Sequence, residues 1–231
     1  MYTQTNLPII LCDFDGTISH QDVTDTLLKH FGMDGYLELE EDWKAGKIGS
    51  RICMREQIAL LDMSPVELDD CLSKIDIDPA FIKFAATAAS LGIPLHIVSD
   101  GLDYAIHHIL QRYRLPSIPV YANRLLYRGE KRWQLEFPYA NANCEKGSGH
   151  CKCKHVSQRC PQSSSILYVG DSTSDFCVSG KVSHVLAKNK LIAYCLQNGI
   201  SHTPIRHFDD AQALWPFICD EIFMTEPETV I

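Results

Sequence analysis

The sequence predicts an α/β fold, a doubly wound parallel sheet that carries a helical insert. Short apolar runs alternate with amphipathic helical patterns over most of the 231 residues, as in parallel sheets covered by helices. Three of these runs end in aspartate or serine beside glycine, and parallel sheets bind their ligands at the ends of such strands. A long helical stretch separates the first run from the others, and we interpret it as an insert.

The chain begins with a strand and then enters the insert. Pro8–Cys12 is a short apolar run that predicts a buried strand, and residues 18–78 then follow a helical pattern. Within them, Ser64-Pro65-Val66-Glu67 predicts a helix start, because serine caps the first turn and proline suits its first position. The predicted domains are a core of residues 1–17 and 79–231 and an insert of residues 18–78.

The alternating pattern resumes after the insert. The further predicted strands are Pro94–Val98, Ser165–Val169 and His184–Ala187, with a hairpin of Val120–Tyr127 and Trp133–Phe137. The predicted helices are Phe81–Leu91, Leu102–Tyr113, a short helix from His155, Lys190–Asn198 and Asp210–Phe223.

Composition excludes several classes of protein. The 21 Lys and Arg against 29 Asp and Glu give a net charge of −8, which argues against nucleic acid as a partner. No apolar run approaches the roughly 20 residues of a membrane span. The first residues lack the basic segment of a signal peptide, so we expect a cytoplasmic location, where the ten cysteines stay reduced.

Acidic side chains follow three predicted strands. They belong to Asp13-Phe14-Asp15-Gly16-Thr17, Ser99-Asp100-Gly101 and Gly170-Asp171-Ser172-Thr173-Ser174-Asp175. Neighbouring strand ends would bring these carboxylates to one crevice, where their mutual repulsion is costly. A divalent cation with oxygen ligands relieves that repulsion, and Mg²⁺ fits such a site.

The same three motifs, in this order and spacing, resemble those of the haloacid-dehalogenase superfamily of phosphohydrolases. The resemblance covers nearly the whole chain and implies that residues 18–78 form a C1-type cap. It implies that Asp13 attacks phosphorus and forms an aspartyl-phosphate, and that Asp15 acts as general acid and then general base. Dehalogenating members lack this second carboxylate, so Asp15 favours a phosphatase.

The resemblance also implies the remaining roles at the site. Thr17, Ser99, Asp100 and Gly101 would bind the phosphoryl group or the substrate. Asp13, the carbonyl of Asp15 and Asp171 would bind Mg²⁺, and Asp175 would support them. The family places a lysine between the second and third motifs, and of Lys131, Lys146, Lys152 and Lys154 we expect Lys154.

Three branches of the superfamily compete for the substrate. The cysteine-rich loop and Ala187-Lys188-Asn189-Lys190-Leu191 resemble the methionine-salvage phosphatases, which act on 2-hydroxy-3-keto-5-methylthiopentenyl-1-phosphate. Ser99-Asp100 and Asp175-Phe176-Cys177 resemble the phosphoethanolamine and phosphocholine phosphatases, and the cap resembles that of phosphoserine phosphatases. A regulatory protein that binds a phosphorylated ligand on the same fold is the alternative from another class, in which an intact Asp15 has no use.

Four cysteines are clustered, namely Cys144, Cys151, Cys153 and Cys160. They have the ligand type for a structural zinc ion but not its usual spacing, so free thiols and a redox pair remain as alternatives. We expect a small phosphomonoester as the ligand, no membrane partner, and either a monomer or a homodimer.

Overall fold

The computed structural model describes residues 8–144, 146–160 and 165–223. The chain divides into two compact units. One consists of Met1–Ile18, Ile77–His96 and Lys152–Ile231, and the other of Ser19–Asp76 and Ile97–Cys151. Residues 97–151 thus group with the helical insert, whereas we predicted them as part of the core; the division into a catalytic core and a cap stays a prediction.

The first unit is built on a parallel sheet. Its strands are β1 (Ile9–Cys12), β5 (Ile166–Gly170), β6 (His184–Ala187) and β7 (His202–Pro204), which pair in parallel in the order β1-β5-β6-β7. Every residue of β1, β5 and β6 is buried. Strands that are buried on both faces need unbroken apolar runs, which is why three of the four were visible in the sequence.

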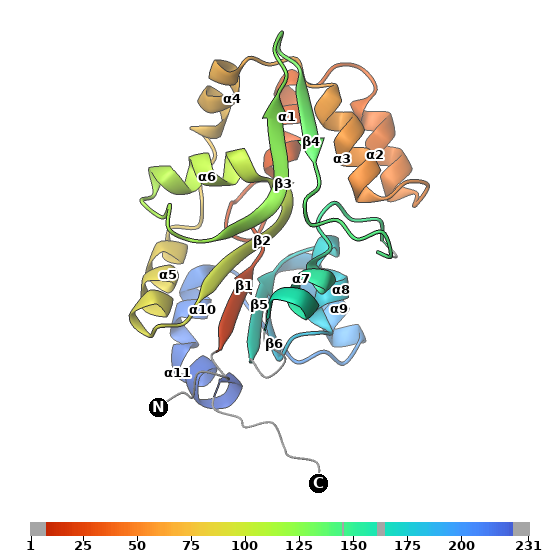
Figure 1. The fold of residues 1–231 in the computed structure, drawn as a ribbon. Helices are drawn as coiled ribbons and strands as arrows, with labels where there is room; N and C mark the ends of the chain where they lie inside the picture. Colours follow the sequence, from red (N-terminus) through yellow and green to blue (C-terminus); the bar gives the residue numbers. More distant parts are fainter. Residues whose placement is uncertain (1–7, 145, 161–164, 224–231) are drawn as a thin grey trace. The chain divides into compact units, whose positions relative to one another are not determined.

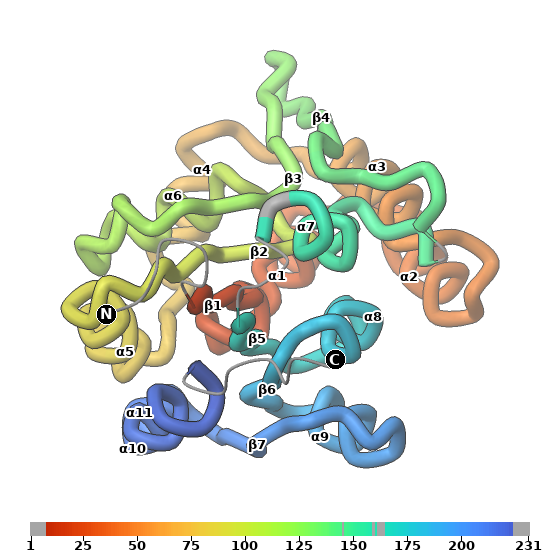
Figure 2. Tube along the Cα trace, turned by 60° about the horizontal axis from the view of Figure 1, so that its bottom comes forward, coloured from red at the N-terminus to blue at the C-terminus, as the bar shows by residue number. Residues whose placement is uncertain are grey.

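Helices cover both faces of this sheet. The helices of the unit are α5 (Ala80–Ser90), α7 (Lys152–Arg159), η1 (Thr173–Asp175), α8 (Phe176–Ser179), α9 (Asn189–Gln197), α10 (Phe208–Ala213), α11 (Trp215–Phe217) and η2 (Ile218–Ile222). Figures 1 and 2 show α5, α10 and α11 on one face and α8 and α9 on the other. The predicted doubly wound α/β fold is therefore confirmed.

Aromatic rings hold α5 against the C-terminal helices. Phe84 stacks on Trp215 with ring centroids 4.9 Å apart, and Phe81 meets Phe208 edge-on at the same separation of 4.9 Å. The single helix predicted over Asp210–Phe223 is divided into α10, α11 and η2, because Pro216 lacks the N–H that a continuous helix requires.

The second unit combines four insert helices with a three-stranded sheet. Its elements are α1 (Val23–Phe31), α2 (Tyr36–Lys44), α3 (Ser50–Ala59), α4 (Pro65–Leu72), α6 (Asp103–Arg112), β3 (Val120–Tyr127) and β4 (Trp133–Glu136). Strand β2 (Leu95–Leu102) begins in the first unit and ends in the second, where it pairs in parallel with β3. The predicted start of α4 is confirmed, because Glu67 N donates to Ser64 Oγ and Ser64 N donates to Glu67 Oε2.

Candidate active site

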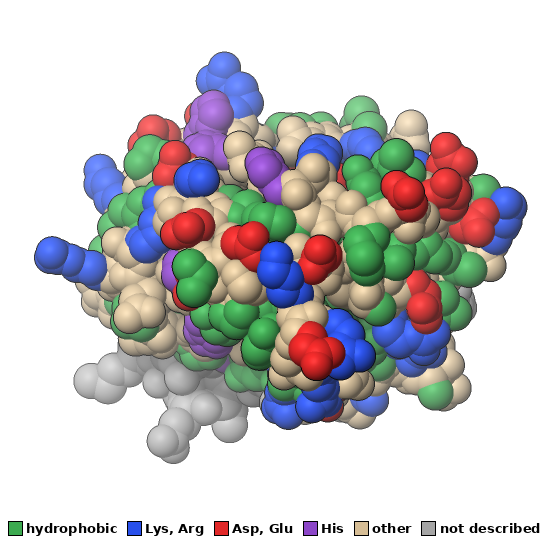
Figure 3. Space-filling view, turned by 90° about the horizontal axis from the view of Figure 1, so that it is seen from above, with side chains coloured by type: hydrophobic (Ala, Val, Ile, Leu, Met, Phe, Trp, Pro, Cys, Tyr) green, Lys and Arg blue, Asp and Glu red, His purple; other side chains and the backbone are tan. Residues whose placement is uncertain are grey.

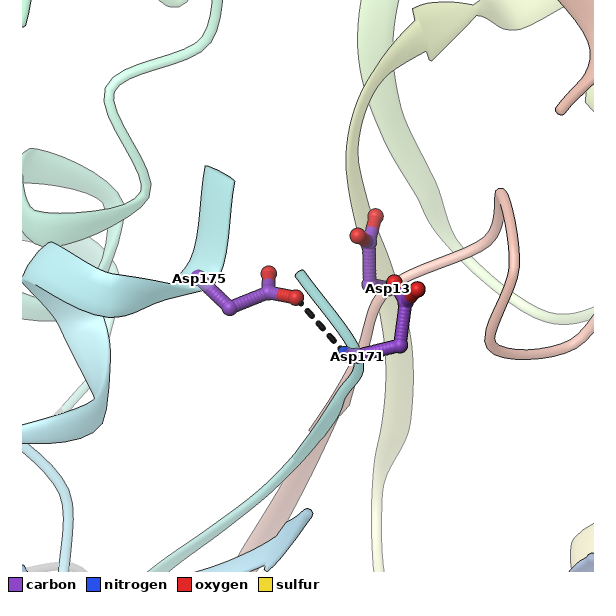
Figure 4. Close-up of side chains that lie close together, drawn as sticks. All are labelled: Asp13, Asp171 and Asp175. Atoms are coloured by element: carbon purple, nitrogen blue, oxygen red, sulfur yellow. Dashed lines mark hydrogen bonds between the residues drawn. The ribbon is translucent and has the colours of Figure 1, made fainter. Parts of the chain in front are cut away.

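Three aspartates meet at the carboxyl ends of β1 and β5. Asp13 follows β1 directly, and Asp171 and Asp175 follow β5; each offers an oxygen within 4.8 Å of the others. All three are buried, with Asp175 fully so. Figure 4 shows the three carboxylates together, with Asp171 N donating to Asp175 Oδ2 over 2.9 Å. The expected convergence of the first and third motifs is thus present.

A buried lysine lies against two of these carboxylates. Lys152 Nζ is 2.9 Å from Asp13 Oδ2 and 2.6 Å from Asp175 Oδ1, and its side chain is 1% exposed. Ser174 Oγ accepts from the same ammonium group over 3.2 Å and donates to Asp13 Oδ2 over 3.4 Å. Asp13 therefore carries a cation and a hydroxyl at one of its oxygens.

The lysine at this position is Lys152, and our expectation of Lys154 is corrected. Helix α7 begins at Lys152, three residues earlier than the predicted start at His155. Its buried residues Lys152, His155 and Val156 are spaced by three and four positions, so they share one face, and Lys154 lies on another. That spacing was the signal in the sequence that could have identified Lys152.

Burial and charge set the proton affinity of the cluster. Burial raises the pKa of Asp13 to about 8, with Asp175 and Asp171 adding to the shift and Lys152 opposing it. Burial and the charge of Asp175 also raise the pKa of Asp171. Although burial opposes it, Lys152 with Tyr168 and the Ser172 N–H lowers the pKa of Asp175. Three carboxyl groups thus share one ammonium group, and burial together with their mutual repulsion favours the protonated forms of Asp13 and Asp171.

Lys188, the residue directly after β6, helps to fix the turn that follows β1. Thr17 N and Ile18 N both donate to Phe14 O, which coils the chain directly after Asp13. Buried Lys188 donates to Thr17 O over 2.9 Å, and Thr17 Oγ1 donates to Asp171 Oδ1 over 3.3 Å. Gly16 has a φ of +70°, and a Cβ there would lie 2.7 Å from Asp171 Oδ2, so any other residue would strain the backbone and displace the Asp171 carboxylate.

Two further polar side chains of this unit were absent from our predicted site. The Tyr168 hydroxyl donates to Asp175 Oδ1, and burial raises the pKa of that phenol. Asn189 Nδ2 donates to Asp171 Oδ2 over 3.4 Å from a residue with a φ of +45°. The sequence gives no signal for Tyr168, which looks like an ordinary strand residue. Asn189 could have been noticed, because asparagine after a strand typically adopts the left-handed conformation.

The residues of the second motif belong to the other unit. Ser99 is buried, its Oγ accepts from Gly101 N over 3.0 Å, and the Asp100 carboxylate accepts from several groups. The roles of Ser99, Asp100 and Gly101 as substrate contacts, and that of part-exposed Asp15 as acid and base, stay predictions.

The cysteine cluster does not gather as a zinc site. Over the described ranges, the three aspartates are the only group of His, Cys, Asp or Glu placed to hold a metal. Although burial opposes it, hydrogen bonds from the Ser148 backbone and side chain, and then from the Lys146 backbone and the Cys151 thiol, lower the pKa of Cys144. The Cys153 thiol instead donates to Cys177 and lowers the pKa of Cys177 to about 7. These separate thiol pairs give the zinc expectation no support.

Surface charge and helix length bear on the expectation that neither nucleic acid nor a membrane is a partner. The face shown in Figure 3 mixes acidic, basic and apolar side chains, unlike the continuous basic surface that nucleic-acid binders present. Among the described helices, none is long and apolar enough to cross a membrane.

Known proteins resemble this chain in sequence and in fold. The family model for haloacid dehalogenase-like hydrolases matches residues 10–179. Proteins named 2-hydroxy-3-keto-5-methylthiopentenyl-1-phosphate phosphatase are 28% identical in an Exiguobacterium species and 31% identical in Exiguobacterium sibiricum. The first match covers 88% of this chain and 95% of its relative, the second 87% and 93%.

Solved structures share the fold at low sequence identity. A phosphoserine phosphatase with an analogue of its phospho-aspartyl intermediate has a TM-score of 0.67 and 16% identity, covering 92% of this chain and 99% of that one. A hydrolase of the same family from Salmonella enterica has a TM-score of 0.70 and 18% identity, covering 93% and 73%.

Proposed function

Since this chain belongs to the haloacid dehalogenase-like hydrolases and is a phosphatase, we propose that it hydrolyses a small phosphomonoester through an aspartyl-phosphate on Asp13. One observation carries the proposal. Asp13 is buried at the end of β1 with one oxygen 2.9 Å from Lys152 Nζ, while Asp171 and Asp175 complete an acidic cluster. A buried carboxylate held in this way is a nucleophile that can be displaced again by water.

Lys152 balances charge through the reaction. The ammonium group fixes Asp13 Oδ2, and it offers a cation to the phosphoryl oxygens as negative charge develops on them. Asp13 and Asp175 raise the pKa of Lys152 further above its usual range, against the effect of burial, so it stays charged. Ser174 Oγ, which contacts both Lys152 and Asp13, is a second group that the phosphoryl transfer can use.

The acidic cluster fits a hard divalent cation. Asp13, Asp171 and Asp175 supply only carboxylate oxygens, which Mg²⁺ prefers. Burial, with the charge of neighbouring carboxylates in addition, raises the pKa of Asp13 and Asp171, so a bound cation would stabilise their ionised forms. Asp13 and Asp171 would hold the ion, with the Asp15 carbonyl as a third ligand and Asp175 in support. When bound, Mg²⁺ supplies charge stabilisation to the transferred phosphoryl group.

Asp15 is proposed as the acid and base of the two half-reactions. It follows Asp13 by two residues in the coiled turn and is part-exposed, so it can exchange protons with solvent. It would protonate the leaving oxygen when Asp13 attacks, and then take a proton from the water that hydrolyses the aspartyl-phosphate. Thr17 and Ser99 would donate to the phosphoryl oxygens.

The proposed substrate is 2-hydroxy-3-keto-5-methylthiopentenyl-1-phosphate. It is the substrate in the printed names of relatives 28% and 31% identical, which this chain matches over 88% and 87% of its length. Phosphoserine is a weaker candidate, because the phosphoserine phosphatase structure shares only 16% identity and supports the fold alone. Phosphocholine and phosphoethanolamine are candidate substrates only because of the sequence motifs at Asp100 and Asp175.

Phosphate release from a panel of esters tests this proposal. The panel contains the enol-phosphate, phosphoserine, phosphocholine and phosphoethanolamine, each with Mg²⁺ and with a chelator. We expect the highest kcat/KM with the enol-phosphate, loss of turnover with chelator, and a fall of at least roughly a thousandfold in Asp13→Asn. Release by Asp13→Asn at the wild-type rate contradicts the mechanism. No release by the folded wild type from any ester favours the regulatory protein.

A further inference from the structure

The Asp100 carboxylate is held by three segments of its own unit. Oδ2 accepts from Ser50 Oγ over 2.9 Å, and Oδ1 accepts from Asn123 Nδ2 over 3.0 Å and from His150 N over 2.7 Å. Ser50 is the first residue of α3, Asn123 lies in β3, and His150 belongs to the loop that precedes α7. One side chain thus joins elements far apart in the sequence.

Strand β2, which contains Asp100, departs from its regular pairing with β3 at this residue. Val98 pairs with Tyr121 and Leu102 pairs with Asn123, so three residues of β2, Ser99 to Gly101, stand opposite a single residue of β3. Such a bulge needs other hydrogen-bond partners for its backbone. Asn123 Nδ2 supplies one by donating to the Asp100 carbonyl over 2.6 Å.

His150 supplies a second hydrogen-bond partner for the backbone of the bulge. Its Nδ1 lies 3.2 Å from Ser99 O and 3.1 Å from Tyr121 O, so that nitrogen carries the proton. The ring is 1% exposed and stacks on Tyr139 with centroids 4.8 Å apart. The loop approaches closely because residue 149 is glycine, where a Cβ would lie 2.6 Å from Asp100 Oδ1.

We propose that Asp100 is a positioning residue, which fixes the bulge that presents Ser99, and is not a contact for a cationic leaving group. The inference rests on the proposed function, in which Ser99 binds the phosphoryl group. Asp100 would act on phosphate affinity whatever the leaving group is. Esters of choline and ethanolamine therefore gain nothing from its charge, which favours an uncharged leaving group.

Substitution of Asp100 by asparagine and by alanine distinguishes a positioning role from a contact with an ammonium group. In Asp100→Asn the amide oxygen still accepts from His150 N and Asn123, and its NH₂ group donates to Ser50 Oγ, so the bulge is kept. In Asp100→Ala all three donors lose their acceptor. A contact for an ammonium group needs the negative charge, so it would be lost equally in both variants.

Binding of inorganic phosphate, measured by calorimetry with Mg²⁺ present, is the first readout. Because phosphate has no leaving group, only the positioning role affects its binding. We expect its Kd to rise roughly tenfold in Asp100→Ala, about threefold in Ser50→Ala, and less than about threefold in Asp100→Asn. Asp42→Asn, which removes a carboxylate paired with Lys47 on the surface, is the control and should bind phosphate as the wild type does.

A double variant tests whether Asp100 acts through Ser99. In a Ser99→Ala background, Asp100→Ala should raise the Kd of phosphate by less than about twofold further, because the group that it positions is gone. A full tenfold effect in that background overturns the proposal. So does an unchanged Kd in Asp100→Ala, even if its melting temperature falls.

Turnover of two esters completes the test and remains decisive if Asp100→Ala does not fold. In Asp100→Asn, kcat/KM for phosphocholine and for p-nitrophenyl phosphate should change by the same factor. A loss of roughly a hundredfold confined to phosphocholine overturns the proposal in favour of an ammonium contact. A wild type that binds phosphate but hydrolyses neither these two esters nor the enol-phosphate contradicts the proposed function alone, whereas a wild type that binds no phosphate overturns both.

Discussion

Lys152 Nζ lies 2.9 Å from Asp13 Oδ2, with both side chains buried at the carboxyl ends of β1 and β5. The same ammonium group lies 2.6 Å from Asp175 Oδ1, so one cation serves two carboxylates. This arrangement makes the lysine both a structural partner and a group available to an incoming phosphate.

Replacement of Lys152 should damage both activity and stability. Lys152→Met leaves Asp13 and Asp175 buried without their cation, so we expect the free energy of unfolding to fall by about 3–5 kcal/mol. We expect kcat/KM to fall by roughly a hundredfold to a thousandfold, because charge on the phosphoryl group loses its stabilisation. Urea unfolding and phosphate release measure the two effects.

Lys154→Met is the matched control, since it removes a lysine of the same helix two residues away. Lys154 is outside the buried face of α7, so wild-type stability and activity are expected. A loss of activity in Lys154→Met together with a normal Lys152→Met enzyme would restore our original assignment of Lys154.

Removal of the Asp15 carboxylate should separate the two half-reactions. In Asp15→Asn the water that attacks the aspartyl-phosphate has no general base, so we expect turnover to fall roughly a hundredfold to ten-thousandfold. An ester with a good leaving group should still load Asp13, and intact-protein mass spectrometry should detect one phosphoryl group. The adduct should be absent in Asp13→Asn. Undiminished turnover by Asp15→Asn rules out the acid and base role.

The sequence identified the elements whose signals are local. Buried parallel strands appear as unbroken apolar runs, so β1, β5 and β6 were predicted nearly to their ends, and the aspartates that follow β1 and β5 were found with them. Strand β7 has only three residues, none of them buried, and carried no such signal.

The features that were missed depend on contacts between distant segments. Residues 97–151 group with the insert, and no periodicity in one segment reports which other segment it packs against. Asp100 looked like a charge available to substrate because its partners, Ser50 and His150, are each 50 residues away. We chose Lys154 in place of Lys152 because the cysteine-rich run before α7 has no recognisable helix cap, so the start of the helix was predicted too late.

Binding of Mg²⁺ should strengthen as the pH rises towards 8. The pKa of Asp13 is raised from its ordinary 3.8 to about 8, so below that value a metal ion must displace a proton from it. The stability that this shift gives the metal-free protein is fully present below pH 3.8 and is lost as the pH rises through about 8. The rise in melting temperature on adding Mg²⁺ should therefore be larger at about pH 8 than at about pH 6. Asp13→Asn should reduce this difference, because Asp171 alone then links proton release to metal binding, and a wild-type response independent of pH would contradict the assignment.

Gly16 and Gly46 form a natural pair for testing the turn at the acidic cluster. Both have a left-handed backbone, with φ of +70° and +73°, but a Cβ on Gly46 meets nothing within 4 Å, whereas one on Gly16 lies 2.7 Å from Asp171 Oδ2. Gly46→Ala should lose only the roughly 1–2 kcal/mol of the left-handed conformation and keep full activity. Gly16→Ala has the same backbone cost and must also displace the Asp171 carboxylate, so its affinity for Mg²⁺ should fall roughly tenfold to a hundredfold. Denaturant unfolding and metal titration of both variants measure this difference, and equal Mg²⁺ affinities would show that Asp171 does not hold the ion.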